Sequence, residues 1–284
     1  MFRILTKRTL TPAITLMEVE APRLAAAAQP GQFLIVRARV QGERIPLTIC
    51  DYDRAKGTVT ICTQAIGAST RLINSLAEGE CFTDFVGPLG QPSEFVAWSD
   101  EKLRSTRFLF VAGGLGAAPV YPQVKYLHEK GAKIDIIAGA KTAELVILEP
   151  ELRAVCDNLF VCTDDGSHGE KGMVTGVIAR LLAEGRHYDQ AVAIGPMIMM
   201  KFTAKTLKES GIPLTVSLNT LMVDGTGMCG ACRVTVGGKT RFACVDGPEF
   251  DAYEVDFDEA MRRQAMYRDL EAEKDHACKI GRDA

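Results

Sequence analysis

Residues 1–100 contain short runs in which apolar or β-branched residues alternate with polar ones, and Gly, Pro or Asp breaks each run. Such runs are typical of β-strands, because successive side chains of a strand point to opposite faces. Many short strands separated by turn residues predict an antiparallel Greek-key barrel. One helix is expected after Gly67, where Ser69 and Thr70 precede the run 71–76. The predicted strands cover residues 13–20, 32–40, 44–50 and 58–63.

From about residue 101, apolar runs alternate with helix-like stretches. The run 107–112 (Arg-Phe-Leu-Phe-Val-Ala) is almost wholly apolar, as in a strand that is buried on both faces. A glycine-rich turn and a helix-like stretch to about Lys130 follow it. Alternation of this kind predicts a parallel sheet with helices on its faces. Further strands are expected at 133–139, 159–163, 190–195 and 213–218, with helices at 144–155, 172–184 and 196–210.

The last part of the chain contains one strand-like run, 233–236, and a charged stretch beyond Phe257 with apolar residues at helical spacing. We therefore expect a single terminal helix. Combined with the change of pattern near residue 101, this predicts three domains: a barrel over 1–100, an α/β domain over 101–217 and a smaller domain over 218–284.

Charge and composition exclude several classes of protein. The net charge of −3 gives no reason to expect nucleic acid or an anionic membrane surface as a partner. No apolar run approaches the ~18 residues of a membrane span, and the N-terminus does not have the order of a secretory signal. The nine cysteines are odd in number and scattered, unlike a disulfide framework. These features favour a cytoplasmic protein.

Three cysteines lie together in a glycine-rich segment: Cys229, Cys232 and Cys244. One iron–sulfur spacing is C-x4-C-x2-C followed by a distant Cys, and this segment matches it with Asp224 in the first position. Glycines at 225, 227 and 230 let the backbone wrap closely around inorganic sulfide. The pattern therefore predicts a [2Fe–2S] cluster.

Two questions about this segment stay open at the level of sequence. Asp224 either binds iron directly or only caps the loop. A zinc knuckle or three buried thiols are the alternatives to a cluster, but zinc sites more often use two Cys-x2-Cys pairs or Cys with His. A zinc-stabilised binding module would be colourless and would leave the glycine loops described next unexplained.

Two glycine-containing loops follow predicted parallel strands. Gly113, Gly114 and Gly116 precede Pro119 and a helix, so backbone N–H groups at the helix N-terminus can face a pyrophosphate. The spacing G-G-x-G-x-x-P is not the G-x-G-x-x-G fingerprint, and alone it is as consistent with tight packing. A second loop, Gly195-Pro196, would lie at the same edge of the sheet. Together the loops favour a ligand crevice.

Some polar residues of the barrel half could also meet an anion. Arg44 and Thr48 lie on one predicted strand, and residues 67–70 begin a helix. Each is equally consistent with an ordinary surface residue. His168, in a polar glycine-rich loop, has no nucleophile or metal-ligand partner in the sequence, and we assign it no catalytic role.

These segments, in this order, resemble the ferredoxin–NADP⁺ reductase superfamily, and the chain as a whole is similar to the electron-transfer subunit of dihydroorotate dehydrogenase. The runs 44–49 and 217–233 are most similar to one branch. That branch is the small (alpha) subunit of electron-bifurcating NADH-dependent reduced ferredoxin:NADP⁺ oxidoreductase, also labelled sulfide dehydrogenase. An aspartate in the first ligand position marks that branch, whereas the dihydroorotate type keeps a cysteine there.

The resemblance implies FAD, a [2Fe–2S] cluster and NAD(H) or NADP(H) as cofactors. Arg44 would meet the FAD pyrophosphate, and the flavin ring would contact Leu47 where many superfamily members have Tyr. The full implied set is Arg44, Pro46, Leu47, Thr48, Gly67, Ser69 and Thr70 for FAD, Gly113, Gly114, Gly116, Pro119, Gly195 and Pro196 for the nicotinamide nucleotide, and Asp224, Cys229, Cys232 and Cys244 for iron.

The implied cofactors form a relay in which no catalytic side chain is required. Nicotinamide transfers two electrons as hydride, an iron–sulfur cluster accepts one at a time, and flavin does both. The chain has no C-x2-C-x2-C-x3-C-P run for a [4Fe–4S] cluster. We therefore expect a heterodimer with a larger flavin and [4Fe–4S] subunit that contacts ferredoxin. A sulfide dehydrogenase or dihydroorotate dehydrogenase complex is the alternative, and Lys141 leaves the choice between NADH and NADPH open.

Overall fold

The computed structural model describes residues 2–279. Residues 2–89 form a seven-stranded antiparallel sheet in the order β6-β1-β2-β5-β4-β3-β7. The edge strands β6 and β7 are separated in sequence only by Thr83, so the chain itself brings the two edges together into a nearly closed barrel. This confirms the predicted barrel. The strands are β1 Phe2–Thr11, β2 Ile14–Glu20, β3 Phe33–Arg37, β4 Ile45–Asp53, β5 Thr58–Gln64, β6 Cys81–Phe82 and β7 Asp84–Leu89.

Two helices accompany the barrel, α1 (Pro22–Ala27) and α2 (Ala68–Ser75). The helix expected after Gly67 therefore exists, and it begins three residues before Arg71. Strand β1 was not predicted. Only Ile4 and Thr11 of this strand are buried, so it carries little of the apolar signal that identifies a strand.

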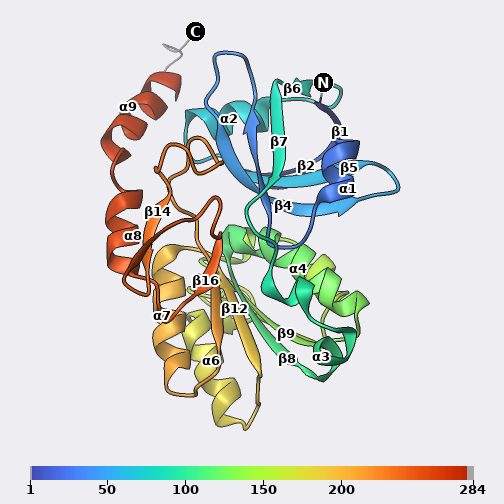
Figure 1. The fold of residues 1–284 in the computed structure, drawn as a ribbon, viewed down its shortest axis with the longest axis vertical. Coiled ribbons are helices and arrows are strands. Elements are labelled where there is room, and N and C mark those ends of the chain that lie inside the picture. The colour runs from blue at the N-terminus through green and yellow to red at the C-terminus, as the bar shows by residue number, and fades with distance from the viewer. Residues whose placement is uncertain (1, 280–284) are drawn as a thin grey trace.

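The second sheet has the order β11-β10-β9-β8-β12-β13-β16 and is parallel except for its last strand. The parallel strands follow the predicted strand–helix alternation, and helices cover both faces (Figure 1). Its strands are β8 Arg107–Gly113, β9 Lys133–Ala140, β10 Asn158–Thr163, β11 Glu170–Lys171, β12 Gln190–Ile194, β13 Leu214–Ser217 and β16 Glu249–Asp251, and its helices are α3 Asp100–Ser105, α4 Ala117–Glu129, α5 Glu149–Arg153, α6 Val174–Ala183 and α7 Met197–Lys208.

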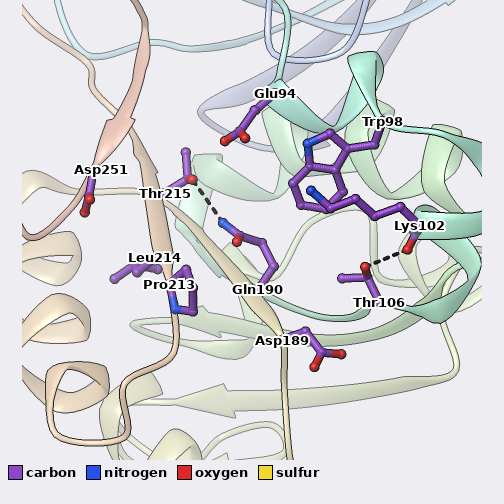
Figure 2. Close-up of a pocket in the computed structure, with 10 residues that line it drawn as sticks. All are labelled: Glu94, Trp98, Lys102, Thr106, Asp189, Gln190, Pro213, Leu214, Thr215 and Asp251. Carbon is purple, nitrogen blue, oxygen red and sulfur yellow. Dashed lines mark hydrogen bonds between the residues drawn. The ribbon is translucent and has the colours of Figure 1, made fainter.

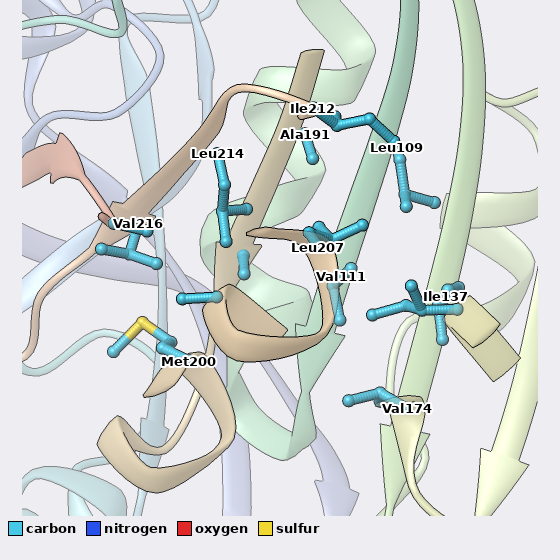
Figure 3. Close-up of a cluster of buried hydrophobic side chains, with 14 of the residues drawn as sticks. Leu109, Val111, Ile137, Val174, Ala191, Met200, Leu207, Ile212, Leu214 and Val216 are labelled. Carbon is cyan, nitrogen blue, oxygen red and sulfur yellow. The ribbon is translucent and has the colours of Figure 1, made fainter. Parts of the chain in front are cut away.

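Alternate residues of β8 enter two different cores. Leu109 and Val111 pack toward α6 and α7 in the cluster shown in Figure 3. Phe108 and Phe110 pack on the other face, against α3, α4 and α5, where barrel residues such as Cys50 join the same core. An apolar core shared by barrel and sheet holds the two parts together, and Lys125 of α4 adds an ion pair to Asp51 of β4 at 2.8 Å.

The C-terminal segment differs from its prediction in three ways. The run 233–236 is one half of a hairpin, β14 (Arg233–Val236) with β15 (Lys239–Phe242). The expected terminal helix is divided into α8 (Phe257–Gln264) and α9 (Arg268–Lys279), and α9 packs against α2 of the barrel (Figure 1). Strand β16 pairs antiparallel with β13. The segment therefore contacts both other parts of the molecule.

Glu249 of β16 lies where the three parts meet. Its Oε1 accepts hydrogen bonds from Ser93 Oγ at 3.1 Å and from Gln123 Nε2 of α4 at 2.7 Å. Desolvation by the surrounding protein raises the pKa of Glu249 to about 7, although these two hydrogen bonds act in the opposite direction. The residue keeps partial contact with solvent.

The raised pKa gives a signed prediction for stability. A carboxyl group with a folded pKa near 7 and an ordinary value near 4.5 destabilises the fold progressively as pH rises between these values, and by a constant amount above them. We expect Glu249→Gln to raise the free energy of unfolding at pH 8 by about 1–3 kcal/mol, and the gain to shrink toward pH 5. Denaturant titrations across this range measure it, with Glu101→Gln, which removes an exposed carboxylate that does not act on Glu249, as control. A gain that does not depend on pH would contradict the assignment.

Candidate functional site

The predicted flavin residues lie on the first half of β4, beside β3. Pro46 pairs with Ile35, and Thr48 pairs with Phe33. From Pro46 to Thr48 the strand is only partly buried, whereas Ile49 and Cys50 are fully covered. The strand thus offers a partly open surface next to a closed core, which suits a flat ring that would cover it.

Arg44 lies directly before this strand, and its charge acts on the cysteine-rich loop. It is exposed, and its Nη1 lies 3.7 Å from Asp84 Oδ2. Its charge also contributes to lowering the pKa of Asp224, after the larger effect of the hydrogen bonds within that loop. A cation in this position is available to a pyrophosphate.

At the start of α2, the hydroxyl of Thr70 caps its own helix. Its Oγ1 accepts from the N–H groups of Ile66 and Gly67, both at 3.0 Å. Ser69 Oγ instead donates to Glu43. The surroundings of Gly67 are open, so a phosphate could reach the helix N-terminus there. Both hydroxyls already donate within the protein, Ser69 to Glu43 and Thr70 to the carbonyl oxygen of Gly67.

The two glycine loops meet at the carboxyl edge of the parallel sheet, because β8 and β12 are adjacent. The first loop forms a 3₁₀ turn, Gly114–Gly116, that leads into α4. A Cβ on Gly116 would lie 2.0 Å from the carbonyl oxygen of Ile194, and one on Gly195 would lie 3.0 Å from Cα of Gly113. Gly113 also abuts Pro196.

These contacts separate the glycines by role. Gly116 and Gly195 are required because backbone packs against backbone, whereas a Cβ on Gly113 would meet the sulfur of Met199 at 2.3 Å. Gly114 has φ +54° and nothing within 4 Å of its Cβ direction, so it faces open space. Only Gly114 therefore leaves room for a ligand, and Pro119 in the first turn of α4 is partly exposed beside it.

In the cysteine-rich loop, Asp224 organises the first half. Its Oδ2 accepts from the N–H of Thr226 at 2.9 Å, the hydroxyl of Thr226 at 2.6 Å and the N–H of Met228 at 3.1 Å. These bonds hold the pKa of Asp224 below its usual range. They all reach Oδ2, so Oδ1 is not engaged by them. The residue can cap the loop and present an oxygen to a metal at once.

Cys229 is exposed, and backbone N–H groups point at its sulfur. Hydrogen bonds from Ala231 and from Asp224 lower the pKa of Cys229 and favour the thiolate. Backbone donors aimed at sulfur are the feature expected of a loop that wraps an anionic cluster.

The other two cysteines form a buried pair. The sulfurs of Cys232 and Cys244 lie 3.2 Å apart as free thiols. Burial and the adjacent Cys232 raise the pKa of Cys244 to about 12, whereas the N–H of Gly227 lowers it. Two neighbouring buried thiols ionise together only when a cation compensates them, so this pair fits a metal. Across the described residues, no three His, Cys, Asp or Glu side chains converge on a single metal position.

The loop sits directly on the barrel. A Cβ on Gly225 would lie 2.9 Å from Cγ1 of Ile35 and 3.2 Å from Cδ1 of Leu89. Cys232 and Cys244 belong to one buried cluster with Phe33 and Ile35 of β3. Strand β3 therefore contacts both predicted sites. The predicted flavin strand is its neighbour in the sheet, and the predicted iron ligands Cys232 and Cys244 pack against its side chains.

A cavity of about 430 Å³ lies elsewhere, between α3 and the amino ends of β12 and β13. Figure 2 shows Trp98 beside Lys102, and Gln190 bonded to Thr215 across the same space. This is the edge of the sheet opposite the glycine loops, and the predicted ligand residues do not line it. We assign it no cofactor.

His168 and Lys141 are given no role in catalysis or cofactor binding. His168 Nε2 pairs with Glu149 Oε2 at 2.8 Å at the surface, an ordinary ion-pair contact between a loop and a helix. Lys141 follows β9 and is exposed, so it leaves the choice of nucleotide open.

Comparison with known proteins agrees with this geometry. Residues 219–256 match the iron–sulfur cluster binding domain of dihydroorotate dehydrogenase B. A Thermotoga maritima homologue of the dihydroorotate dehydrogenase B electron transfer subunit is 45% identical over 89% of this chain and 86% of its own, and the Geobacillus kaustophilus subunit is 35% identical over 80% and 86%. The chain belongs to this family of electron-transfer subunits.

An uncharacterized protein of Clostridium beijerinckii is 56% identical over 94% of this chain and 91% of its own. A solved structure described as NADH-dependent reduced ferredoxin-NADP oxidoreductase superimposes with a TM-score of 0.89 at 41% identity and covers 96% of this chain and 97% of that one. These matches confirm the resemblance predicted from the sequence.

Members of the family are oxidoreductase subunits, and the chain is accordingly an electron-transfer subunit that uses FAD, an iron–sulfur cluster and a nicotinamide nucleotide. As a subunit, it works with a partner protein. In the described part of the chain, we find no helix with the length and apolar character needed to cross a membrane.

Sequence reasoning missed several residues around this electron-transfer site. Glu43 adjoins Arg44 but shows its contact with Ser69 only in the fold. Glu249 and Gln123 are 126 residues apart and have no motif. No signal in the sequence identifies them, because their importance comes from a contact between distant segments.

The separation of glycine roles can be tested with two substitutions. We expect Gly116→Ala to destabilise the protein by about 1–3 kcal/mol, because its Cβ would overlap the Ile194 carbonyl. Gly114→Ala should fold, at a cost of about 1 kcal/mol for its positive φ, and should weaken nucleotide binding. Thermal melts and calorimetric binding of NADH and NADPH measure both. Equal losses of stability in the two variants would contradict the distinction.

Proposed function

We propose that this chain is the smaller, NAD(H)-using subunit of an electron-bifurcating NADH-dependent reduced ferredoxin:NADP⁺ oxidoreductase. The observation that carries the proposal is the agreement over the whole chain with the solved enzyme of that description, at 41% identity and a TM-score of 0.89. Asp224 in the first ligand position supports the same branch.

The barrel residues would hold FAD. Partly exposed Pro46, Leu47 and Thr48 would contact the ring, Arg44 would neutralise the pyrophosphate, and the N-terminus of α2 with Ser69 would bind phosphate. FAD exchanges electrons in pairs with nicotinamide and singly with a cluster. On this proposal, the polypeptide positions the groups and excludes water, and no side chain acts as an acid or base toward substrate.

The glycine loops would bind the nicotinamide nucleotide at the carboxyl edge of the sheet. Gly114 leaves the space, and Gly113, Gly116, Gly195 and Pro196 fix the two loops against each other. Pro119, which has no N–H, occupies the first turn of α4, where N–H groups have no partner within the helix. A rigid, preformed crevice limits the ordering cost of binding.

The iron ligands would be Asp224 with Cys229, and Cys232 with Cys244. Two pairs suit a cluster of two irons, each bound by two side chains. In the first pair Cys229 is exposed and Asp224 is partly exposed, whereas the second pair is buried against β3. These residues would hold a cluster between the barrel and the outer surface of the loop, where Met228 is 86% exposed. A single electron could leave through the outer side.

The partner would be a larger subunit with a second flavin and [4Fe–4S] clusters that contacts ferredoxin. The chain offers one set of cluster ligands and no motif for a [4Fe–4S] centre, so electrons that reach its cluster need a further acceptor. Relatives named as electron transfer subunits of dihydroorotate dehydrogenase B support a second candidate function, in which this chain passes electrons to a different partner subunit. Reconstitution with each partner and its own acceptor separates the two.

The role of Asp224 can be decided by three variants. If Asp224 binds iron, Asp224→Ala should lose most of the cluster, and Asp224→Cys should keep it with an altered electron paramagnetic resonance spectrum. Asp224→Asn keeps a side-chain oxygen that can accept from the N–H groups of Thr226 and Met228. Iron content and spectrum unchanged in Asp224→Asn would show that Asp224 only caps the loop.

The requirement for a partner gives a further prediction. The isolated chain should oxidise NADH with artificial acceptors but reduce no ferredoxin, and purification under native conditions should yield a complex with a larger flavoprotein. Gel filtration with activity assays on each fraction tests this. Full ferredoxin-linked activity in a fraction that contains this chain alone would refute it.

A further inference from the structure

Glu249 connects the cluster segment to both other parts of the protein. It lies five residues beyond Cys244, and its neighbour Phe250 packs on the buried cluster that contains Cys232 and Cys244. The intervening residues are fixed to the end of β7: Gln91 donates its N–H to Gly247 O at 2.7 Å and its Nε2 to Val245 O at 2.8 Å. Glu249 is therefore fixed on the same short segment as the predicted iron ligand Cys244.

The partner of Glu249 can serve either protonation state. Gln123 is fully buried, its Nε2 donates to Glu249 Oε1, and its own Oε1 has no partner within the described structure. An amide nitrogen suits the ionised carboxylate. Rotation of the amide by half a turn would present Oε1 instead, which can accept a hydrogen bond from the O–H of the neutral acid. The buried, unsatisfied acceptor is explained if both states are used.

Few charged groups near Glu249 could hold it in a single protonation state. Ser93 donates to Glu249 from the segment after β7, and the exposed carboxylate of Glu94 next to it raises the pKa of Glu249. On β13 the facing residue is Ser217. From α4, Lys125 is bound to Asp51 and turned to the barrel. No cation among these groups pairs with Glu249.

We propose that Glu249 is a charge-compensating group of the electron relay, which takes up one proton from solvent when an electron arrives on the neighbouring cluster and releases it when the electron leaves. The inference rests on the proposed function for the cluster itself. The nicotinamide supplies the electron, the solvent supplies the proton, and the carboxylate becomes the neutral acid.

The physical basis is that the charge on the predicted cluster and the charge on Glu249 affect each other. An added electron makes the buried junction more negative, which raises the proton affinity of Glu249, and by linkage an ionised Glu249 makes reduction less favourable. Desolvation brings its pKa to about 7, so the group can change state at physiological pH. Partial exposure gives the proton a route to solvent.

The first experiment concerns the proton and needs no cofactor. Infrared difference spectra of the full chain, titrated with acid, should show a protonated carboxyl band that is lost with a midpoint near pH 7 and is absent in Glu249→Gln. Gln123→Leu removes a hydrogen bond that is stronger to the ionised carboxylate than to the neutral acid, and should therefore raise the proton affinity about tenfold. A Glu249 midpoint close to its ordinary value, or one indifferent to Gln123→Leu, would overturn the inference.

The second experiment concerns the coupling and uses the reconstituted protein. The potential of the cluster should fall as pH rises between about 6 and 8, and in Glu249→Gln it should be flat over this range. Glu94→Gln, which removes a nearby exposed carboxylate, should keep the dependence. The same slope in wild type and Glu249→Gln would overturn the coupling.

The two experiments distinguish failure of the inference from failure of the proposed function. A protein that never binds iron refutes the predicted cluster, whereas the infrared titration still reports on Glu249. A protein that binds the cluster but shows no effect of Glu249→Gln keeps its proposed function and loses this inference.

Discussion

Close packing of the cysteine-rich loop on barrel strand β3 is the constraint on which the rest depends. Gly225 lies against Ile35 at a distance that admits no side chain, and Cys232 and Cys244 are buried with Phe33. Electron transfer needs neighbouring cofactors, and this contact places the predicted iron ligands one strand away from the predicted flavin residues. A larger residue at 225 would push the loop away from the barrel.

The remaining architecture keeps that contact in place. Barrel and parallel sheet share one apolar core around α4. The glycine loops and the predicted flavin strand therefore keep a fixed position relative to each other. Strand β16 joins the far edge of the sheet, and α9 returns to α2. The C-terminal segment is thus attached to both other parts of the molecule, and its loop with the predicted iron ligands is held in place between these attachments.

The position of Glu249 at this junction lowers the stability of the fold. A carboxyl group is placed where its ionised form is poorly solvated, and two hydrogen bonds compensate only in part. Natural proteins keep such groups where their charge has a use. Here the use is set by position: the carboxyl adjoins the segment in which electrons are expected to arrive.

The sequence by itself determined the classes of element and the candidate chemistry. Period-two runs identified the barrel, strand–helix alternation identified the parallel sheet, and the spacing of Asp224, Cys229, Cys232 and Cys244 pointed to a cluster, because local patterns depend on residues close in the chain. Only the tertiary structure decided that Gly116 serves packing and Gly114 leaves space, that β16 completes the nucleotide sheet, and that Glu249 meets Gln123. Those facts arise from contacts between segments that lie from 32 to 126 residues apart in the chain, and no local pattern of residue types encodes them.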